Sequence, residues 1–287
     1  MTFTTRFAPS PTGPLHLGHA YSAMLAHDMA RAAKGTFLLR IEDIDQTRAR
    51  PGWEAQIYDD LRWLGLNWPE PVMRQSDRLP AYRAALERLW DMDLLYPCTC
   101  SRRDIEIAAS APQEGVERVL GPDGPVYPGT CRPAAPPPGA MPRALPLRLD
   151  MARALAMAGT PEFTETGQGP GGQSGAISSD CKAMLTGIGD VVLSRRNMGT
   201  SYHLSVVVDD AAQSVSHVVR GQDLFEATAI HVLLQRLLDL PTPVYHHHRL
   251  IRDETGKRLA KRDDARAIAL FRAEGASPMD IRGLVGL

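Results

Sequence analysis

The sequence has little of what would place it in a specialised class of protein. Only four of its 287 residues are cysteines, too few for a disulfide framework at this length. It has no run of 18 or more apolar residues, so a membrane-spanning helix is not expected. Its first residues include His16, His19, His27 and Asp28, where a signal peptide needs an uninterrupted apolar stretch. These absences predict a cytoplasmic protein with no membrane contact.

The sequence also lacks a strong net charge of either sign. Its formal net charge is −1 and its isoelectric point is near 6.8, so any contact with nucleic acid must depend on a local basic patch. Hydrophobic residues make up 44% of the chain, enough for a sizeable core, and the length fits one large or two modest domains. The composition indicates a globular protein and neither supports nor excludes RNA binding.

The most informative stretch lies near the start and reads Arg6-Phe-Ala-Pro-Ser10-Pro-Thr-Gly13-Pro-Leu-His16-Leu-Gly18-His19. Alternation before it predicts a strand over 2–8, and apolar spacing after Gly18 predicts a helix. The two histidines therefore lie where a loop enters a helix, a place where free N–H groups and the helix dipole favour phosphate. Taken alone, a His-x-x-His pair there is more often a cap or a surface feature.

A second strand is expected over 36–41, and it ends at Glu42, Asp43 and Asp45. Strand, helix and strand in this order predict a right-handed βαβ unit. Open α/β sheets bind ligands beyond the carboxyl ends of their parallel strands, so carboxylates here suit a ligand site. The simpler interpretation of Asp43 and Asp45 is that they cap a loop.

The rest of the chain predicts two α/β halves around an insert. Amphipathic helices are expected over 52–65 and 80–94, before a segment rich in proline and glycine over 97–146. A glycine-rich stretch over 167–179 is expected to be a flexible excursion. Beyond it we predict strands over 189–195, 204–208, 216–220 and 244–251, a helix over 223–240 capped by Asp223, and terminal helices over 263–274 and 277–284. The expected division is 1–97, 98–146, 147–240 and 241–287.

Three of the four cysteines lie in the insert, as Cys98-Thr-Cys100 and Tyr127-Pro-Gly-Thr-Cys131. Zinc prefers four ligands in a tetrahedron, and no histidine lies between Cys100 and Cys131, which excludes a Cys₃His site from this segment. Tyr127 can complete the set if the metal lowers the pKa of its phenol. The alternative is three buried, reduced cysteines without a metal, and Cys181 is expected to be structural.

A basic cluster over 257–262 follows the last predicted strand, and by itself it is a solvated surface. Together with the stretch near the start, it resembles the two signatures of the class I aminoacyl-tRNA synthetases. His16-Leu17-Gly18-His19 is similar to His-Ile-Gly-His, and Arg258-Leu-Ala260-Lys261-Arg262 is similar to Lys-Met-Ser-Lys-Ser. The resemblance implies a Rossmann-like α/β catalytic domain with a small zinc-binding insert and a short helical C-terminal segment.

In these enzymes a carboxylate attacks the α-phosphorus of ATP, and charge builds on phosphate oxygens and on the departing pyrophosphate. The resemblance implies that His16 and His19 serve the α-phosphate and that Lys261 serves the leaving group. Gly18 and Arg258 would complete the ATP site, with Mg²⁺ as the accompanying cation. Ala260 replaces the serine of the signature and so removes a hydroxyl donor.

The substrate follows from a closer resemblance to the glutamate branch, carried by four segments: 6–13, 40–45, 202–210 and 218–224. Glutamate presents one ammonium and two carboxylates, which call for an acidic partner and a well-placed arginine, preferably bidentate. The resemblance implies that Glu42 contacts the ammonium and that Tyr202 and Arg220 contact the carboxylates. Arg6, Ala8 and Ser10 would bind the rest of the amino acid.

The cysteine and tyrosine spacing resembles the metal insert of glutamyl-queuosine tRNA-Asp synthetases, shortened paralogues of glutamyl-tRNA synthetase. This implies one structural zinc held by Cys98, Cys100, Tyr127 and Cys131. Only the residues 263–287 follow the basic cluster, too few for an anticodon-binding domain. We therefore expect a monomer that activates L-glutamate with ATP and transfers it to the queuosine base of tRNA-Asp. The alternatives are a truncated glutamyl-tRNA synthetase that charges the tRNA 3′ end, and a non-catalytic RNA-binding paralogue.

Overall fold

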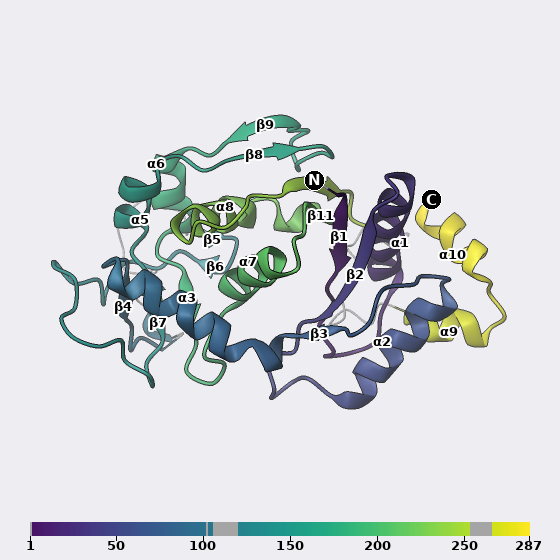
Figure 1. Cartoon of the computed structure of the whole chain (residues 1–287), viewed down its shortest axis with the longest axis horizontal. Coiled ribbons are helices and arrows are strands. Elements are labelled where there is room, and N and C mark those ends of the chain that lie inside the picture. Colours follow the sequence, from purple (N-terminus) through teal and green to yellow (C-terminus); the bar gives the residue numbers. More distant parts are fainter. Residues whose placement is uncertain (1, 102, 106–119, 253–265) are drawn as a thin grey trace.

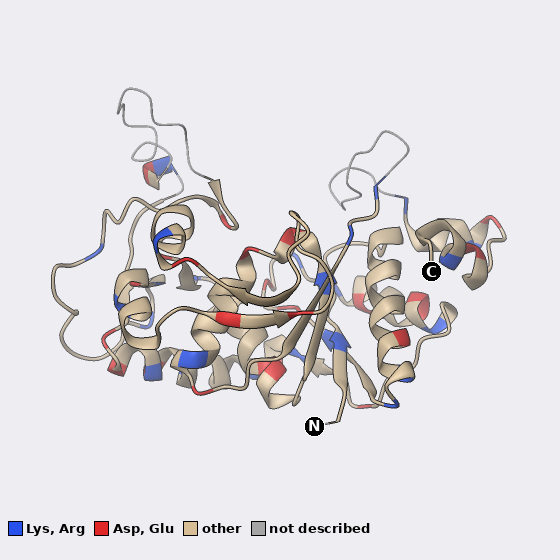
Figure 2. Ribbon diagram, turned by 90° about the horizontal axis from the view of Figure 1, so that it is seen from above, with Lys and Arg blue, Asp and Glu red and all other residues tan. Residues whose placement is uncertain are grey.

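The computed structural model of the chain describes residues 2–101, 103–105, 120–252 and 266–287. The basic cluster, including Arg258 and Lys261, lies outside these ranges. Within them, no helix has the length and apolar character needed to span a membrane. Basic and acidic positions are interspersed over both halves of the molecule, as the small net charge leads one to expect (Figure 2).

The start of the chain forms the predicted βαβ unit. Strand β1 (Thr4–Phe7) pairs in parallel with β2 (Thr36–Ile41), and helix α1 (Leu17–Ala32) connects them. Strand β3 (Met73–Arg74) pairs in parallel with the far edge of β2. The carboxyl ends of these parallel strands therefore lie at one edge of the sheet (Figure 1).

The second half of the sheet adds to the other side of β1. The Ser216 N–H donates to the Thr4 carbonyl at 2.9 Å, which places β11 (His217–Gly221) beside β1. Strand β11 pairs in parallel with β12 (Val244–His248), and β12 pairs in parallel with β8 (Glu162–Glu165). Strands are therefore added on both sides of β1, with β2 and β3 on one side and β11, β12 and β8 on the other. Open α/β sheets bind ligands in the crevice where the strand order reverses in this way.

Helices cover the two sides of β1 and β2 (Figure 1). Helix α1 packs against β1, β2 and β11, and one apolar core joins it to α2 (Pro51–Trp63) and to the terminal helices α9 (Ile268–Ala273) and α10 (Pro278–Val285). A second core joins α3 (Leu79–Asp91), α5 (Met151–Ala158), α7 (Tyr202–Ala212) and α8 (Ala227–Leu237). The first of these cores contains the apolar side chains of β1 and β2, and a smaller third core packs β8, β11 and β12 against α8.

The insert attaches to the second core through a small antiparallel sheet. Strand β7 (Leu147–Leu149) lies between β4 (Leu95–Pro97) and β10 (Val192–Ser194), and β5 (Leu120–Gly121) forms a hairpin with β6 (Gly124–Pro125). Tyr127 makes an isolated bridge to Gly189. Short helical turns complete the described chain: η1 (Gln75–Arg78), α6 (Cys181–Ala183), η2 (Met184–Ile188) and η3 (Gln222–Leu224).

Three local predictions differ from the structure. The run 204–208, predicted as a strand, lies inside helix α7, because Ser201 caps that helix and a short apolar run does not distinguish a strand from a buried helix. Asp223 lies in η3 and does not cap α8, whose N-cap is Glu226. Part of the stretch 167–179 is the strand β9 (Gly175–Ser178), which pairs antiparallel with β8. Hairpin pairing therefore orders a segment that its glycines alone predict to be flexible.

Candidate active site

A cavity of about 380 Å³ lies at the carboxyl ends of β1, β2 and β11. The six residues predicted to bind the amino acid all line it: Arg6, Ala8, Ser10, Glu42, Tyr202 and Arg220. The rest of the lining comes from Phe7, Ser22, Val219, Gly221 and Leu224. The structure thus brings together residues from four distant segments, while their contact with glutamate stays a prediction.

A carboxylate from α7 holds one wall of the cavity. Asp210 accepts from Arg6, with Nε to Oδ1 at 2.9 Å and Nη2 to Oδ2 at 3.2 Å, and also from Arg40, with Nη1 to Oδ1 at 2.7 Å. Burial alone would raise the pKa of Asp210, but the two guanidinium groups outweigh it and hold that pKa below its ordinary value. Asp210 is therefore ionised and orients Arg6 toward the cavity.

Glu42 supplies the acidic side chain of the cavity. Its Oε1 accepts from Arg40 Nη2 at 3.2 Å, and its backbone N–H donates to the Pro9 carbonyl at 3.0 Å, which ties the end of β2 to the loop after β1. Burial raises the pKa of Glu42 even though Arg40 and Arg6 lower it. A cationic ligand in the cavity would lower this pKa again, because it stabilises the ionised carboxylate. The site therefore favours an ammonium group beside Glu42.

Arg220 is only 5% exposed, and side chains of the second half of the sheet surround it. Its Nε donates to His247 Nε2 at 3.0 Å, and its Nη1 lies 3.0 Å from His231 Nδ1. Its Nη2 donates to Thr228 Oγ1 at 2.6 Å and to the Leu224 carbonyl at 3.2 Å. Burial and then the nearby Arg220 charge hold the pKa of His231 well below its usual range. Burial also lowers the pKa of His247, so the groups that accept hydrogen bonds from this guanidinium within the described parts of the chain are neutral.

The two histidines of the first signature cap helix α1. His16 is the N-cap, and its Nδ1 accepts from the Gly18 N–H at 3.1 Å, while His19 Nδ1 accepts from the His16 N–H at 3.1 Å. A Cβ at Gly18 would lie 3.0 Å from the His16 ring, so glycine fits this close approach. Because both Nδ1 atoms accept, each neutral ring carries its proton on Nε2. Capping thus fixes the tautomer in which a histidine donates from Nε2.

The histidine segment adjoins both the cavity and the chain that borders the basic cluster. The His19 ring centroid lies 6.5 Å from that of Phe7, which lines the cavity. The Ile268 N–H donates to the Leu15 carbonyl at 2.9 Å, and His16 forms a bridge with Ala267. The first residues described after the basic cluster therefore lie against the capped start of α1. Arg258 and Lys261 themselves are outside the described residues.

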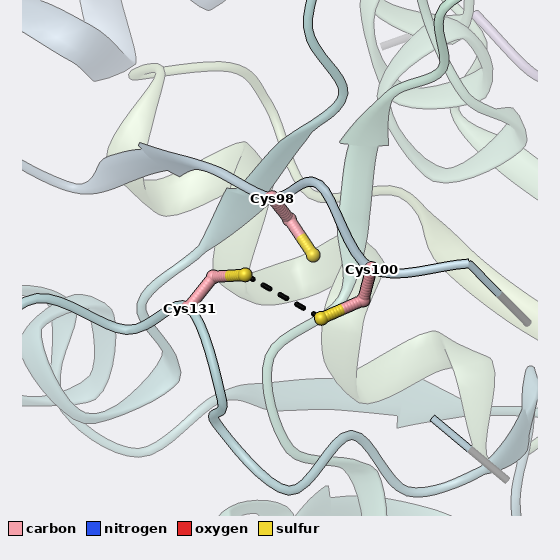
Figure 3. A group of neighbouring side chains, drawn as sticks. All are labelled: Cys98, Cys100 and Cys131. Atoms are coloured by element: carbon pink, nitrogen blue, oxygen red, sulfur yellow. Dashed lines mark hydrogen bonds between the residues drawn. The ribbon is translucent and has the colours of Figure 1, made fainter. Parts of the chain in front are cut away.

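The predicted metal ligands lie together in the insert. The sulfur atoms of Cys98, Cys100 and Cys131 point toward one another and lie within 4.8 Å of one another (Figure 3). The Tyr127 hydroxyl oxygen lies 3.5 Å from Cys98 Sγ and 3.6 Å from Cys100 Sγ. A zinc ion with bonds of about 2.3 Å to sulfur and about 2.0 Å to oxygen places its ligand atoms about 3.5 to 3.8 Å apart in a tetrahedron. Three thiols and one phenol therefore fit such an ion.

The surroundings of Tyr127 favour its charged form once a metal is bound. Burial raises the pKa of Tyr127, and hydrogen bonds with the three thiols raise it further, so the phenol keeps its proton in the absence of a cation. The Cys131 N–H donates to the phenol oxygen at 2.7 Å, and the Arg148 guanidinium lies 3.7 Å from the ring centroid. Both contacts stabilise negative charge on that oxygen.

Two acidic residues near Glu42 have the structural role that the sequence predicts. Asp43 Oδ1 accepts from the Ser76 N–H at 2.8 Å. Asp45 Oδ1 accepts from the Thr47 hydroxyl at 2.6 Å and from its N–H at 3.2 Å. Both carboxylates therefore hold loops in place.

Sequence reasoning gave no role to several residues that support the cavity: Arg40, Asp210, His203, His231 and His247. Asp210 follows Tyr202 at a helical spacing, which would have placed both residues on the same side of a helix. This relationship was missed because a strand was predicted over 204–208. His203 and His231 gave no local signal, because apolar residues flank each of them in the sequence, and His247 lies within a run of three histidines that does not single it out. Their positions become informative only when β11, α7 and α8 are packed together.

Comparison with known proteins agrees with this geometry. The family model for the catalytic domain of class I tRNA synthetases (E and Q) matches residues 2–118 and 168–287. The chain is 68% identical over 286 residues to the Glutamyl-Q tRNA(Asp) synthetase of Rhodobacter capsulatus, a match that covers 99% of both chains. It is 43% identical over 268 residues to the protein of that name from Geobacter sulfurreducens, which covers 93% of this chain and 78% of the relative.

Solved structures agree on the fold. A glutamate tRNA ligase from Elizabethkingia meningosepticum, in complex with its amino acid, has a TM-score of 0.76 and 25% sequence identity. That match covers 100% of this chain, which spans 61% of the length of the ligase. The chain thus has the catalytic fold of the class I tRNA synthetases, which are ligases. Within that class, it belongs to the family of glutamyl-Q tRNA(Asp) synthetases.

Proposed function

We propose that this enzyme activates L-glutamate with ATP, without needing tRNA, and transfers the glutamate to the queuosine base in the anticodon of tRNA-Asp. The observation that carries the first step is the shared cavity, where an acidic side chain and two arginines lie beside a pair of helix-capping histidines. The names of the relatives support the acceptor. A glutamate site beside a phosphate site is what formation of glutamyl-adenylate requires.

The charges of the cavity match those of glutamate. Glu42 binds the ammonium, and Arg6, Tyr202 and Arg220 bind the carboxylates. Within the described residues, Arg6 uses the Nε and Nη2 edge of its guanidinium on Asp210. It retains its Nη1 donors and the second N–H of Nη2, and this end of the group suits a paired grip on a carboxylate. Arg220 has already used four of its five N–H donors and offers a single one. Ala8 and Ser10 frame the ligand from the loop after β1.

The nucleotide lies at the start of α1. His16 and His19 donate from Nε2 to the α-phosphate as its charge develops, and Gly18 allows the chain to approach closely. Lys261 and Arg258 serve the departing pyrophosphate, with Mg²⁺ bound to the phosphates. These cations act by electrostatic stabilisation, because phosphoryl chemistry asks little covalent help from the protein.

The metal in the insert is structural zinc, held by Cys98, Cys100, Tyr127 and Cys131. It would supply a crosslink between the segment after β4 and the segment after β6, and it takes no part in the reaction. The phenol as fourth ligand is supported by its 3.5 and 3.6 Å distances to two of the thiols. We further propose the four-part division 1–97, 98–146, 147–240 and 241–287, a monomeric enzyme and a cytoplasmic location.

Glutamate-dependent exchange of pyrophosphate into ATP, measured without tRNA, tests the activation step. Wild type should catalyse the exchange, and Glu42→Gln should raise the KM for glutamate by about tenfold or more, because a hydrogen bond to a charged group is lost, while the KM for ATP changes little. Glu54→Gln, on helix α2, serves as the matched control and should behave as wild type. Absence of exchange in correctly folded, metal-replete wild-type protein would contradict the proposal.

A further inference from the structure

We infer that Asp123, His203 and His231 are positioning residues for the glutamate cavity, because they form a hydrogen-bonded chain that orients Arg220 from the hairpin of the insert. The inference rests on the proposed function and assigns roles to residues outside the cavity lining. The chain connects the insert to the glutamate cavity, although the proposed reaction does not require such a connection.

The chain of contacts is continuous. Arg220 Nη1 lies 3.0 Å from His231 Nδ1, and His231 Nε2 lies 3.1 Å from His203 Nδ1. His203 Nε2 then lies 2.9 Å from Asp123 Oδ2. His203 and His231 are 3% and 1% exposed, so water reaches neither ring easily. Three hydrogen bonds thus join β11, α8, α7 and the turn between β5 and β6.

The donors and acceptors of this chain have only one consistent arrangement. A guanidinium has donors and no acceptor, so His231 Nδ1 must accept from Arg220 and be unprotonated. A neutral His231 then carries its proton on Nε2 and donates to His203 Nδ1. His203 in turn carries its proton on Nε2 and donates to the Asp123 carboxylate. Arg220 at one end and Asp123 at the other therefore require the same tautomer of both rings, and Asp123 completes the chain that orients Arg220.

A second chain reaches the same guanidinium from the opposite side. Arg220 Nε donates to His247 Nε2, and His247 Nδ1 lies 2.5 Å from Glu165 Oε2. Glu165 is fixed by the backbone N–H groups of His247 and Gly167 at 2.8 and 2.7 Å. Both chains run from the arginine through neutral imidazoles, two in the first and one in the second, to a carboxylate at the far end.

Imidazoles between Arg220 and the carboxylates have a chemical consequence. Asp210 forms a direct ion pair with Arg6, whereas the partners of Arg220 among the described residues are neutral acceptors. Its positive charge therefore stays available to an anionic ligand, while four hydrogen bonds hold the group in place. This arrangement suits a residue that must attract one carboxylate with a single remaining donor.

The end of the chain lies in the insert. Asp123 is in the turn of the β5–β6 hairpin, and it lines a cavity of about 440 Å³ together with Cys98, Cys100 and Tyr127. The Asp123 side chain is 48% exposed, so replacing it does not open a buried core. The position of the insert thereby determines the orientation of Arg220 in the glutamate cavity.

Steady-state pyrophosphate exchange by Asp123→Ala and Asp123→Asn tests the inference. An asparagine carbonyl still accepts from His203 Nε2, whereas alanine leaves that donor without its partner. Asp123→Ala should raise the KM for glutamate by about tenfold, the effect of one charge-assisted hydrogen bond, with the KM for ATP within about twofold of wild type. Asp123→Asn should stay close to wild type in both values, as should the exposed control Asp91→Ala at the end of α3.

Three outcomes would overturn the inference: an unchanged KM for glutamate in Asp123→Ala, an equal loss in Asp123→Asn, or a parallel rise in the KM for ATP. A nitrogen NMR measurement on ¹⁵N-histidine-labelled wild type gives an independent readout at neutral pH. His231 should show an unprotonated Nδ1 and a protonated Nε2, and the reverse tautomer would also overturn it. If wild type shows no exchange at all, the proposed function fails, while the NMR result still decides the chain of contacts.

Discussion

Arg6 and Asp210 join β1 to α7 through two parallel hydrogen bonds, at 2.9 Å and 3.2 Å, across a sequence separation of 204 residues. Arg40 adds a third hydrogen bond to the same carboxylate at 2.7 Å. The side chains of both arginines and of Asp210 are almost fully buried. One carboxylate thus fixes two cations at the edge of the cavity proposed for glutamate and ties β1 and β2 to α7.

Removing the charge of Asp210 should therefore lower the stability of the fold. In Asp210→Asn the two guanidinium groups are left partly uncompensated, and we expect the free energy of unfolding to fall by about 3 kcal/mol, as for other broken buried ion pairs. Urea denaturation measures this change. The exposed pair of Arg88 and Asp239 offers a control, because Asp239→Asn should cost less than about 1 kcal/mol. Equal effects of the two substitutions would contradict the role given to Asp210.

Asparagine in place of His16 or His19 should separate capping from catalysis. An asparagine side chain supplies an acceptor close to where Nδ1 lies, so it preserves the cap of α1, but it has no group at the position of Nε2. We expect the free energy of unfolding to change by less than about 1 kcal/mol, while the rate of pyrophosphate exchange falls about 10²-fold or more. Exchange at the wild-type rate in both variants would show that these histidines only cap the helix.

Tyr127→Phe should weaken metal binding without removing the three thiols. Elemental analysis of purified wild type should find about one zinc per chain, and competition with a chelator should show at least about tenfold weaker binding in the variant. Tyr58→Phe, on helix α2, should bind zinc as wild type does. Identical zinc affinity in Tyr127→Phe and wild type would mean that another group, such as water, provides the fourth ligand.

Buried histidines should make the fold less stable in mild acid. Burial lowers the pKa of His231 and of His247 below the usual value near 6.5, so folding favours the neutral form of both rings. Below about pH 6.5 the unfolded chain takes up protons that the folded chain does not, and the free energy of unfolding therefore falls as the pH falls. Asp60 acts in the opposite direction, since burial and Asp59 raise its pKa to about 6.

We expect the two histidines to prevail, with a loss of about 2 kcal/mol between pH 7 and pH 5.5. Urea denaturation at a series of pH values measures it. His231→Gln should make the pH dependence shallower. A stability that is constant or increases over this range would contradict the neutral state assigned to the buried rings.

Local patterns were enough to predict the parts of the fold whose signal lies within a short stretch. The βαβ unit over 4–41 and the helix start at His16 follow from alternation, turn residues and helical spacing. Helix α7 could not be predicted in this way, because its apolar run is buried on several faces and carries no clear period. Packing in the second core, and not the β-propensity of its residues, determines that this run forms a helix.

Six residues of the cavity lining were predicted by resemblance, whereas the residues that orient them were not. Asp210 contacts Arg40 across 170 positions, and His203 contacts Asp123 across 80. Such contacts have no signature in a single sequence, since each partner occupies an ordinary position in its own element. The supporting network therefore became visible only in the assembled structure.

Transfer of radiolabelled glutamate to tRNA-Asp tests the central claim most directly. The enzyme, ATP, Mg²⁺ and labelled glutamate are incubated with tRNA-Asp that contains queuosine and with tRNA-Asp that lacks it, and each product is cleaved to separate the anticodon fragment from the 3′ end. We predict label in the anticodon fragment of the queuosine-containing tRNA and none in the other tRNA. Equal labelling of both, or label at the 3′ end, would contradict the claim and indicate a glutamyl-tRNA synthetase.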